Sequence, residues 1–227
     1  MRALWTASTG MKAQQFNIDT IANNLSNVNT TAYKTGRAEF KDLFYSTLKK
    51  GRIQDDEGRP VNLEVGHGTM PVATKRDFRN GNLMPTEGTF DVAIDGEGFF
   101  AVELPDGETA YTRDGSFKIS VDNDEGYLVT SEGYYVLSED DDFIVIESGL
   151  KDIAIDEFGY ITGEDEFGEI IDLGRIGLVK FTNPEGLQSE GRNLYTMTTA
   201  SGEVMPVEVE DMRSEERRVG KECRSRW

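Results

Sequence analysis

Residues 3–28 read ALWTASTGMKAQQFNIDTIANNLSNV and predict a long helix with one apolar seam. Two series repeat every seven residues along it, and seven of the eight members are apolar: Leu4, Met11, Ile18 and Leu25, then Ala7, Gln14, Ile21 and Val28. This spacing is typical of a coiled-coil helix. Burial of the seam could contribute on the order of 10 kcal/mol, whereas an isolated helix is marginal in water. We therefore expect the helix to need a partner.

The chain is strongly acidic, with a formal net charge of −18 and a pI near 4.4. This charge disfavours nucleic acid and anionic membrane surfaces as partners. The sequence has no apolar run of about 18 residues, so we expect no direct membrane insertion. Residues 1–15 are too polar for a cleaved secretory signal, and any export should therefore use another route.

Residues 213–227, RSEERRVGKECRSRW, differ in composition from the rest of the chain. They carry six basic and three acidic residues and the only cysteine, Cys223. The stretch resembles a vector-derived peptide, so we expect a non-native tail and set it aside from the fold. A native basic tail is the alternative. Without Cys223 the chain has no thiol for a disulfide or a metal site.

The predicted helix ends in an Asn- and Thr-rich stretch whose side chains compete with helical hydrogen bonds. This stretch closely resembles the shared amino-terminal motif of the flagellar rod and hook protein family, through Ala22, Asn23, Asn24, Leu25, Ser26, Asn27, Val28, Asn29, Tyr33 and Lys34. In that family the first helix pairs with a second one at the extreme carboxyl terminus, and both line a hollow helical assembly. We find no second heptad run between residues 37 and 212. We therefore expect this chain to form its β-domain but not to polymerise alone.

The connector after the motif is ambiguous. Residues 37–50 place four apolar side chains at helical intervals and predict a short amphipathic helix, although an extended connector fits nearly as well. Residues 51–69 are rich in Gly and charge and predict a long loop. In the resembling family, an extra segment at this point marks the distal rod branch. A proximal rod or hook paralogue is the alternative.

From Met70 onward the apolar period changes from helical to alternating, which predicts an antiparallel β-sandwich or barrel over residues 71–212. We expect strands within residues 92–94, 99–104, 143–147, 153–155 and 176–181, separated by turn dipeptides such as Asp106-Gly107, Glu125-Gly126 and Phe158-Gly159. The family resemblance continues through DVAIDGEGFF, YTRDGSF and FTNPEGLQSEGRNLY. The predicted fold is thus mainly β with a long N-terminal coiled-coil-type helix, divided into residues 1–34, 35–70, 71–212 and 213–227.

The sequence offers little catalytic chemistry. The run Glu139–Asp142 predicts a solvated loop, because its charges repel one another. His67 is the only histidine and should lie in a solvent-exposed loop, so neither a multi-histidine metal site nor a catalytic triad is readily assembled. Residues 122–126 fit a hairpin turn better than a calcium loop, and Gly96-Glu97-Gly98 fits a tight turn better than a dinucleotide fingerprint. We predict no catalytic, cofactor or metal residues; an exported acidic hydrolase is the alternative.

The resemblance implies a structural subunit of the bacterial flagellar basal-body rod, closest to its distal branch. Such subunits assemble with themselves into a tubular drive shaft that transmits torque to the hook. The implied partners are other rod subunits, the hook protein and, in outer-membrane bacteria, the P- and L-ring proteins. The implied location is extracytoplasmic, after export through the flagellum's own channel. We also expect the helix to order only when neighbours cover its seam.

Overall fold

A computed structural model describes residues 2–49, 62–122, 125–147, 149–165, 167–207, 218–221 and 223–226. The chain is mainly β, with one N-terminal helix and antiparallel strand pairs, which confirms the predicted fold class. Within the described ranges the sheets stay open, so the barrel alternative is not adopted. The chain divides into two compact units, Met1–Val28 with Lys34–Asp77, and Asn29–Tyr33 with Phe78–Trp227.

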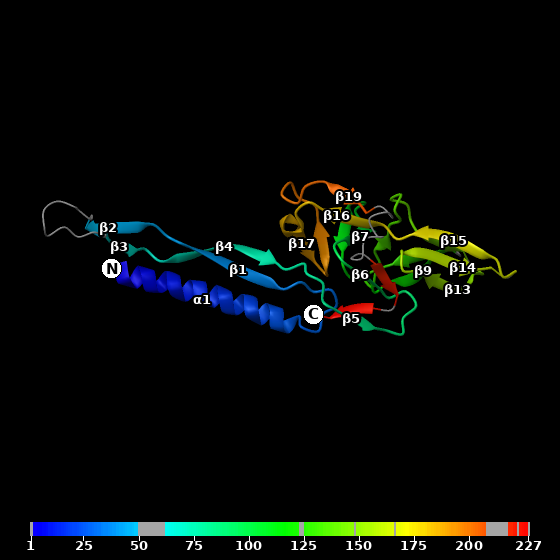
Figure 1. Cartoon of the computed structure of the whole chain (residues 1–227), viewed down its shortest axis with the longest axis horizontal. Coiled ribbons are helices and arrows are strands. Elements are labelled where there is room, and N and C mark those ends of the chain that lie inside the picture. Colours follow the sequence, from blue (N-terminus) through cyan, green and yellow to red (C-terminus); the bar gives the residue numbers. More distant parts are fainter. Residues whose placement is uncertain are drawn as a thin grey trace. The chain divides into compact units, whose positions relative to one another are not determined.

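The first unit consists of a helix and two β-ribbons (Figure 1). The helix α1 (Arg2–Ser26) packs along β1 (Gly36–Asp42) and β4 (Thr69–Arg76), which pair antiparallel. In the second ribbon, β2 (Tyr45–Lys49) pairs antiparallel with β3 (Leu63–Gly66). The ribbon of β1 and β4 supplies the surface against which one face of the helix is packed.

The connector after the helix is extended, so the amphipathic helix predicted over residues 37–50 is wrong and its extended alternative is correct. The register of β1 against β4 shifts between Glu39 and Phe40. The extra residue of this bulge is Val72 on β4. The apolar residues of the connector are divided between two strands, with Phe40 on β1, Leu43 and Phe44 after it and Leu48 on β2, so their helix-like spacing spans a break between strands. Leu63–Gly66 is also a strand, within a stretch predicted to be a loop. Residues 50–61 of that predicted loop lie outside the described residues.

The second unit contains a ten-stranded and a three-stranded antiparallel sheet. The larger sheet holds β7 (Phe99–Glu103), β8 (Thr109–Thr112), β9 (Lys118–Asp122), β10 (Glu125–Val129), β11 (Tyr135–Val136), β12 (Val145–Glu147), β16 (Leu178–Phe181), β17 (Gln188–Gly191), β18 (Leu194–Thr196) and β19 (Val204–Pro206). The smaller one holds β13 (Lys151–Ile155), β14 (Tyr160–Glu164) and β15 (Ile170–Arg175). A 3-10 turn, Pro184–Gly186, precedes β17.

Strand β7 is buried on both faces and lies between two hydrophobic clusters. Phe100 and Val102 belong to one cluster, whereas Phe99 and Ala101 belong to the other. Alternate side chains of a strand point to opposite faces of its sheet, so a strand covered on both sides needs the continuous apolar run that this sequence supplies. The second cluster is held by edge-to-face rings, including Phe99 against Phe181 with centroids 5.5 Å apart.

The predicted strands and turns of this unit are largely confirmed. Each of the five predicted runs contains a strand, with β6 at Val92–Asp95. Gly107 and Gly159 adopt positive φ in turns, as their dipeptides predicted. Glu125-Gly126 is different, because Gly126 lies inside β10 and pairs with Ile146. The predicted hairpin is confirmed by the pairing of β9 with β10, and its residues 123 and 124 lie outside the described residues.

The backbone of the tail takes part in the fold, although the sequence led us to set it aside. β20 (Arg218–Lys221) pairs with β6, and β21 (Cys223–Arg226) pairs with β5 (Asn82–Pro85). An unpaired strand edge accepts another strand through backbone hydrogen bonds, whatever its side chains are. Pairing of this kind therefore requires no particular tail sequence.

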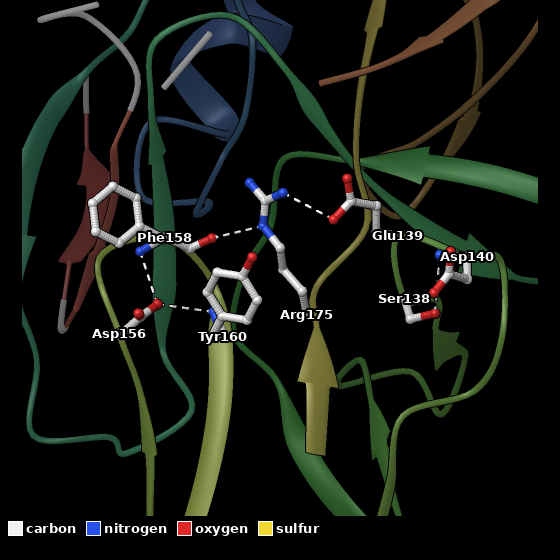
Figure 2. A network of polar contacts seen from close by, with 7 residues as sticks. All are labelled: Ser138, Glu139, Asp140, Asp156, Phe158, Tyr160 and Arg175. Atoms are coloured by element: carbon white, nitrogen blue, oxygen red, sulfur yellow. Dashed lines mark hydrogen bonds and ion pairs between the residues drawn. The ribbon is translucent and has the colours of Figure 1, made fainter. Parts of the chain in front are cut away.

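Arg175 links the end of β15 to the acidic turn 138–142 (Figure 2). Its side chain is only 4% exposed, and its guanidinium donates from Nε to the Phe158 carbonyl and from one terminal nitrogen to Glu139 Oε2, both at 2.9 Å. The Arg175 guanidinium also lies 5.5 Å from the centroid of the Tyr160 ring. The four acidic residues Glu139–Asp142 are all exposed, which agrees with the predicted solvated loop. Glu139, whose side chain is 38% exposed, forms an ion pair with Arg175, because a buried cation needs a counter-charge.

None of the helices among the described residues combines the length and the apolar character that a membrane span requires.

Candidate assembly interface

All eight predicted seam side chains are exposed on the described chain. Leu4 is 76% exposed and Leu25 is 70% exposed, and the row continues through Ala7, Met11, Gln14, Ile18, Ile21 and Val28. The helix ends at Ser26, so Val28 lies in the turn that follows rather than in the last helical turn. An exposed apolar row of this length on one helix face is unusual for a protein surface and is typical of an interaction surface.

The opposite face of α1 is packed against the ribbon of β1 and β4. Ala13 is buried, and at about 100° per residue it points about 160° away from Met11. The Phe16 and Phe40 rings meet edge to face with centroids 6.4 Å apart. The helix therefore has an intramolecular partner through a face that the sequence did not indicate. The sequence led us to expect a helix that orders only on assembly, because it showed no partner for the helix within the chain. In the structure the helix is formed and packs on β1 and β4 of its own unit.

Glycine at position 68 permits a close approach between the helix and the backbone that precedes β4. Gly68 adopts φ +115, and a Cβ placed there would lie 2.1 Å from the Thr9 hydroxyl oxygen. The backbone of Gly68 is also fixed, since its carbonyl accepts a hydrogen bond from the Leu43 N–H at 2.9 Å. Only glycine combines this backbone conformation with the space available.

The family motif fixes the end of the helix. The Asn24 side-chain amide donates to the Gly36 carbonyl at 2.8 Å and accepts from the Gly36 N–H at 3.0 Å. This pair joins the last turn of α1 to the first residue of β1. At the end of the helix, the Ser26 hydroxyl donates to the Ala22 carbonyl at 2.9 Å, and the side-chain amide of Asn27, just after the helix, donates to the Asn23 carbonyl at 3.0 Å. Motif residues thus orient the helix end while leaving the seam open.

The remaining motif residues differ in exposure. Asn29 is exposed, Tyr33 is half-buried and Lys34 is buried. In the second unit the Thr31 carbonyl accepts a hydrogen bond from the Asn193 side-chain amide at 2.9 Å. Sequence reasoning missed this role of Asn193, which has φ +60 in the tight turn between β17 and β18. Asparagine tolerates positive φ, so an asparagine directly after a strand is a signal that could have indicated this hairpin turn.

Asn193 is a junction between three segments of the second unit. Besides contacting Thr31, its amide lies 3.3 Å from Asp114 Oδ2, and its carbonyl accepts from the Thr112 hydroxyl at 3.0 Å. Side-chain contacts of this kind hold residues 29–33 on the sheet. The segment that follows the helix is therefore fixed by named polar contacts rather than by apolar burial alone.

The candidate groups for other chemistry are dispersed. His67 lies between β3 and β4, where it is half-buried rather than fully exposed. Its backbone N–H donates to the Phe44 carbonyl at 3.1 Å. Over the ranges that the structure describes, no three His, Cys, Asp or Glu side chains are placed to hold a metal ion. Among the described residues, the exposed apolar seam is therefore the best candidate for a surface that binds a partner protein.

Two profiles of known protein families match this chain. A family profile described as flagella basal body rod protein matches residues 4–34, and one described as flagellar hook protein FlgE/F/G D1 domain matches residues 93–163. The flagellar basal-body rod protein FlgG of Borreliella burgdorferi is 48% identical over 207 residues, covering 89% of this chain and 76% of the relative. The chain belongs to the flagellar basal-body rod protein family. The FlgG protein of Bacillus subtilis is 35% identical over 203 residues, covering 89% and 75%.

Membership of the rod protein family confirms the resemblance that the motif indicated. A further relative, the flagellar hook-basal body complex protein FlhP of Bacillus subtilis, is 31% identical over 209 residues, covering 88% of this chain and 77% of its own length. The first profile spans every seam residue and the whole amino-terminal motif. As a member of the rod protein family, this chain is a structural subunit of the flagellar rod.

Proposed function

We propose that this protein is a subunit of the distal flagellar rod that assembles with copies of itself and with other rod subunits, and that the seam of α1 is its main assembly surface. The exposure of all eight seam residues carries the proposal. Full burial of one leucine, isoleucine or methionine contributes about 1.5–3 kcal/mol. Coverage of Leu4, Met11, Ile18 and Leu25 by neighbouring helices would thus stabilise assembly by roughly 6–12 kcal/mol per subunit before ordering costs.

The helix is suited to this role because its two faces have separate tasks. One face packs on β1 and β4, and Asn24 holds the helix end through two hydrogen bonds to Gly36. A helix held in this way presents the seam in a fixed direction, which lowers the entropy lost on association. A helical tube of such subunits would transmit torque through the packed helices.

The assembled protein has partners of several kinds. Each subunit contacts copies of itself, other rod subunits and the hook protein, and in outer-membrane bacteria the P- and L-ring proteins that surround the shaft. The protein reaches this place by export through the flagellum's own channel. The assignment to the distal branch rests on the position of residues 51–69, where the distal branch of the family carries an extra segment.

Purified hook–basal bodies provide the test of this proposal. We expect mass spectrometry to detect the protein in them and immunogold electron microscopy to place it in the rod zone next to the hook. Label near the cytoplasmic end of the rod would assign the protein to the proximal rod instead. Its absence from basal bodies of cells that synthesise it would overturn the proposal.

A further inference from the structure

Three aromatic rings form an exposed cluster in the second unit, outside both hydrophobic clusters. Tyr127 lies on β10, Tyr135 on β11 and Phe143 just before β12. The centroid of the Tyr135 ring is 5.5 Å from that of Tyr127 and 5.1 Å from that of Phe143, and the other two centroids are 6.5 Å apart. Phe143 is 44% exposed, and both tyrosines are half-buried. We call these three residues the aromatic triad.

The triad occupies the outer face of the sheet, where alternation would normally place polar side chains. The neighbours of its members in sequence, Leu128, Val136 and Ile144, are buried in the main hydrophobic cluster on the other face. The same strands therefore supply the core with one set of side chains and the surface with the triad. Exposed rings that pack on one another form a preformed platform with little side-chain entropy left to lose.

A row of carboxylates borders the triad. Glu125 pairs with Asp122 across β9–β10 and with Glu147 across β10–β12, so three exposed acidic residues lie side by side on three strands. Like charges directly opposite one another destabilise a sheet. The Tyr127 hydroxyl donates to Glu125 Oε2 at 2.7 Å. This hydrogen bond and the nearby negative charges raise the pKa of Tyr127 above its usual value.

We propose that the triad and its carboxylate row bind a lysine- or arginine-bearing segment of a partner protein. The apolar stem of such a side chain packs on the rings, its cationic head is attracted to their faces, and the carboxylates supply the counter-charge. A bound cation would also relieve the repulsion within the row. With its net charge of −18, a second copy of this chain is poorly matched to the site. This inference goes beyond the seam and does not depend on it.

The probe for this site is a short blocked peptide of alternating lysine and glycine, titrated into the whole protein and followed by NMR and calorimetry. We expect the ring resonances of Tyr127 and Tyr135 to shift on binding. The isosteric double variant Glu125→Gln/Glu147→Gln should weaken binding about two- to tenfold, and Tyr127→Ser/Phe143→Ser should weaken it by a similar factor. A serine–glycine peptide of the same length should not bind.

The matched control removes two carboxylates elsewhere on the same unit. Asp106→Asn/Glu108→Gln has the same net charge as the glutamine double variant but lies in the turn between β7 and β8. If this control weakens binding as much as Glu125→Gln/Glu147→Gln does, peptide binding depends only on the net charge of the protein, and the proposed site is wrong. Unshifted ring resonances with the parent protein would also overturn it. The seam variant Ile18→Glu should bind the peptide normally, so this test is separate from that of rod assembly.

Discussion

Replacing Ile18 and Leu25 with glutamate should abolish rod assembly and motility while leaving the isolated protein folded. Both side chains are exposed in the subunit, so the change removes no internal packing. In the assembled rod, the two substitutions would forfeit about 3–6 kcal/mol of apolar burial per subunit and would place two carboxylates in an apolar contact. Swimming in soft agar and electron microscopy of isolated basal bodies measure the outcome.

Lys12→Glu is the matched control, because it changes the net charge by the same two units as the double seam variant. Lys12 is exposed on α1 but lies about 100° around the helix from Met11. We expect cells with this variant to keep their rods. Normal rods in the Ile18→Glu/Leu25→Glu strain would mean that the seam is not the assembly surface.

The second large effect concerns Arg175. We expect Arg175→Ala to lower the free energy of unfolding by about 3 kcal/mol, because it removes a buried side chain together with its packing and its charge-assisted hydrogen bonds. The change leaves the Phe158 carbonyl without its guanidinium donor and deprives Glu139 of its counter-charge. Urea denaturation followed by tyrosine fluorescence measures the loss. Hydrogen exchange should accelerate in β13, β14 and β15 before the larger sheet is affected.

Two further variants show whether the ion pair or general packing is responsible. Arg192→Ala removes an exposed arginine whose contact with Glu132 is 3.7 Å long, and it should cost less than about 1 kcal/mol. Arg175→Met keeps an apolar stem in the buried site and should be milder than Arg175→Ala. Equal losses for Arg175→Ala and Arg192→Ala would show that the network in Figure 2 is not a structural anchor.

The parts of the fold that sequence predicted are those set by local patterns. The helix follows from a seven-residue apolar repeat, and β7 follows from a continuous apolar run that is buried on both faces. Turns at Gly107 and Gly159 follow from residues that tolerate positive φ. In each case the residues that determine the element are its own members or close neighbours.

The parts that sequence missed depend on distant residues. β1 is extended because β4 supplies its hydrogen-bond partners, and the break at Leu43–Phe44 between β1 and β2 disguised the alternation of the two strands. Arg175 pairs with Glu139 over 36 residues of sequence, so the acidic run showed only repulsion. The packed face of α1 was missed because Thr6 and Thr9 lie close to the ribbon at Gly68, and threonines do not register as an apolar stripe.

The most direct measurement of the central claim is thiol labelling of the seam in free and assembled protein. In a Cys223→Ser background, Met11→Cys and Lys12→Cys place a thiol on the seam and on a lateral face of α1. Both should react rapidly with a maleimide in the monomer, since both positions are exposed. In purified rods we predict strong protection of Cys at position 11 and continued labelling at position 12. Equal labelling of position 11 in rods and in monomers would contradict the claim that neighbouring subunits cover the seam.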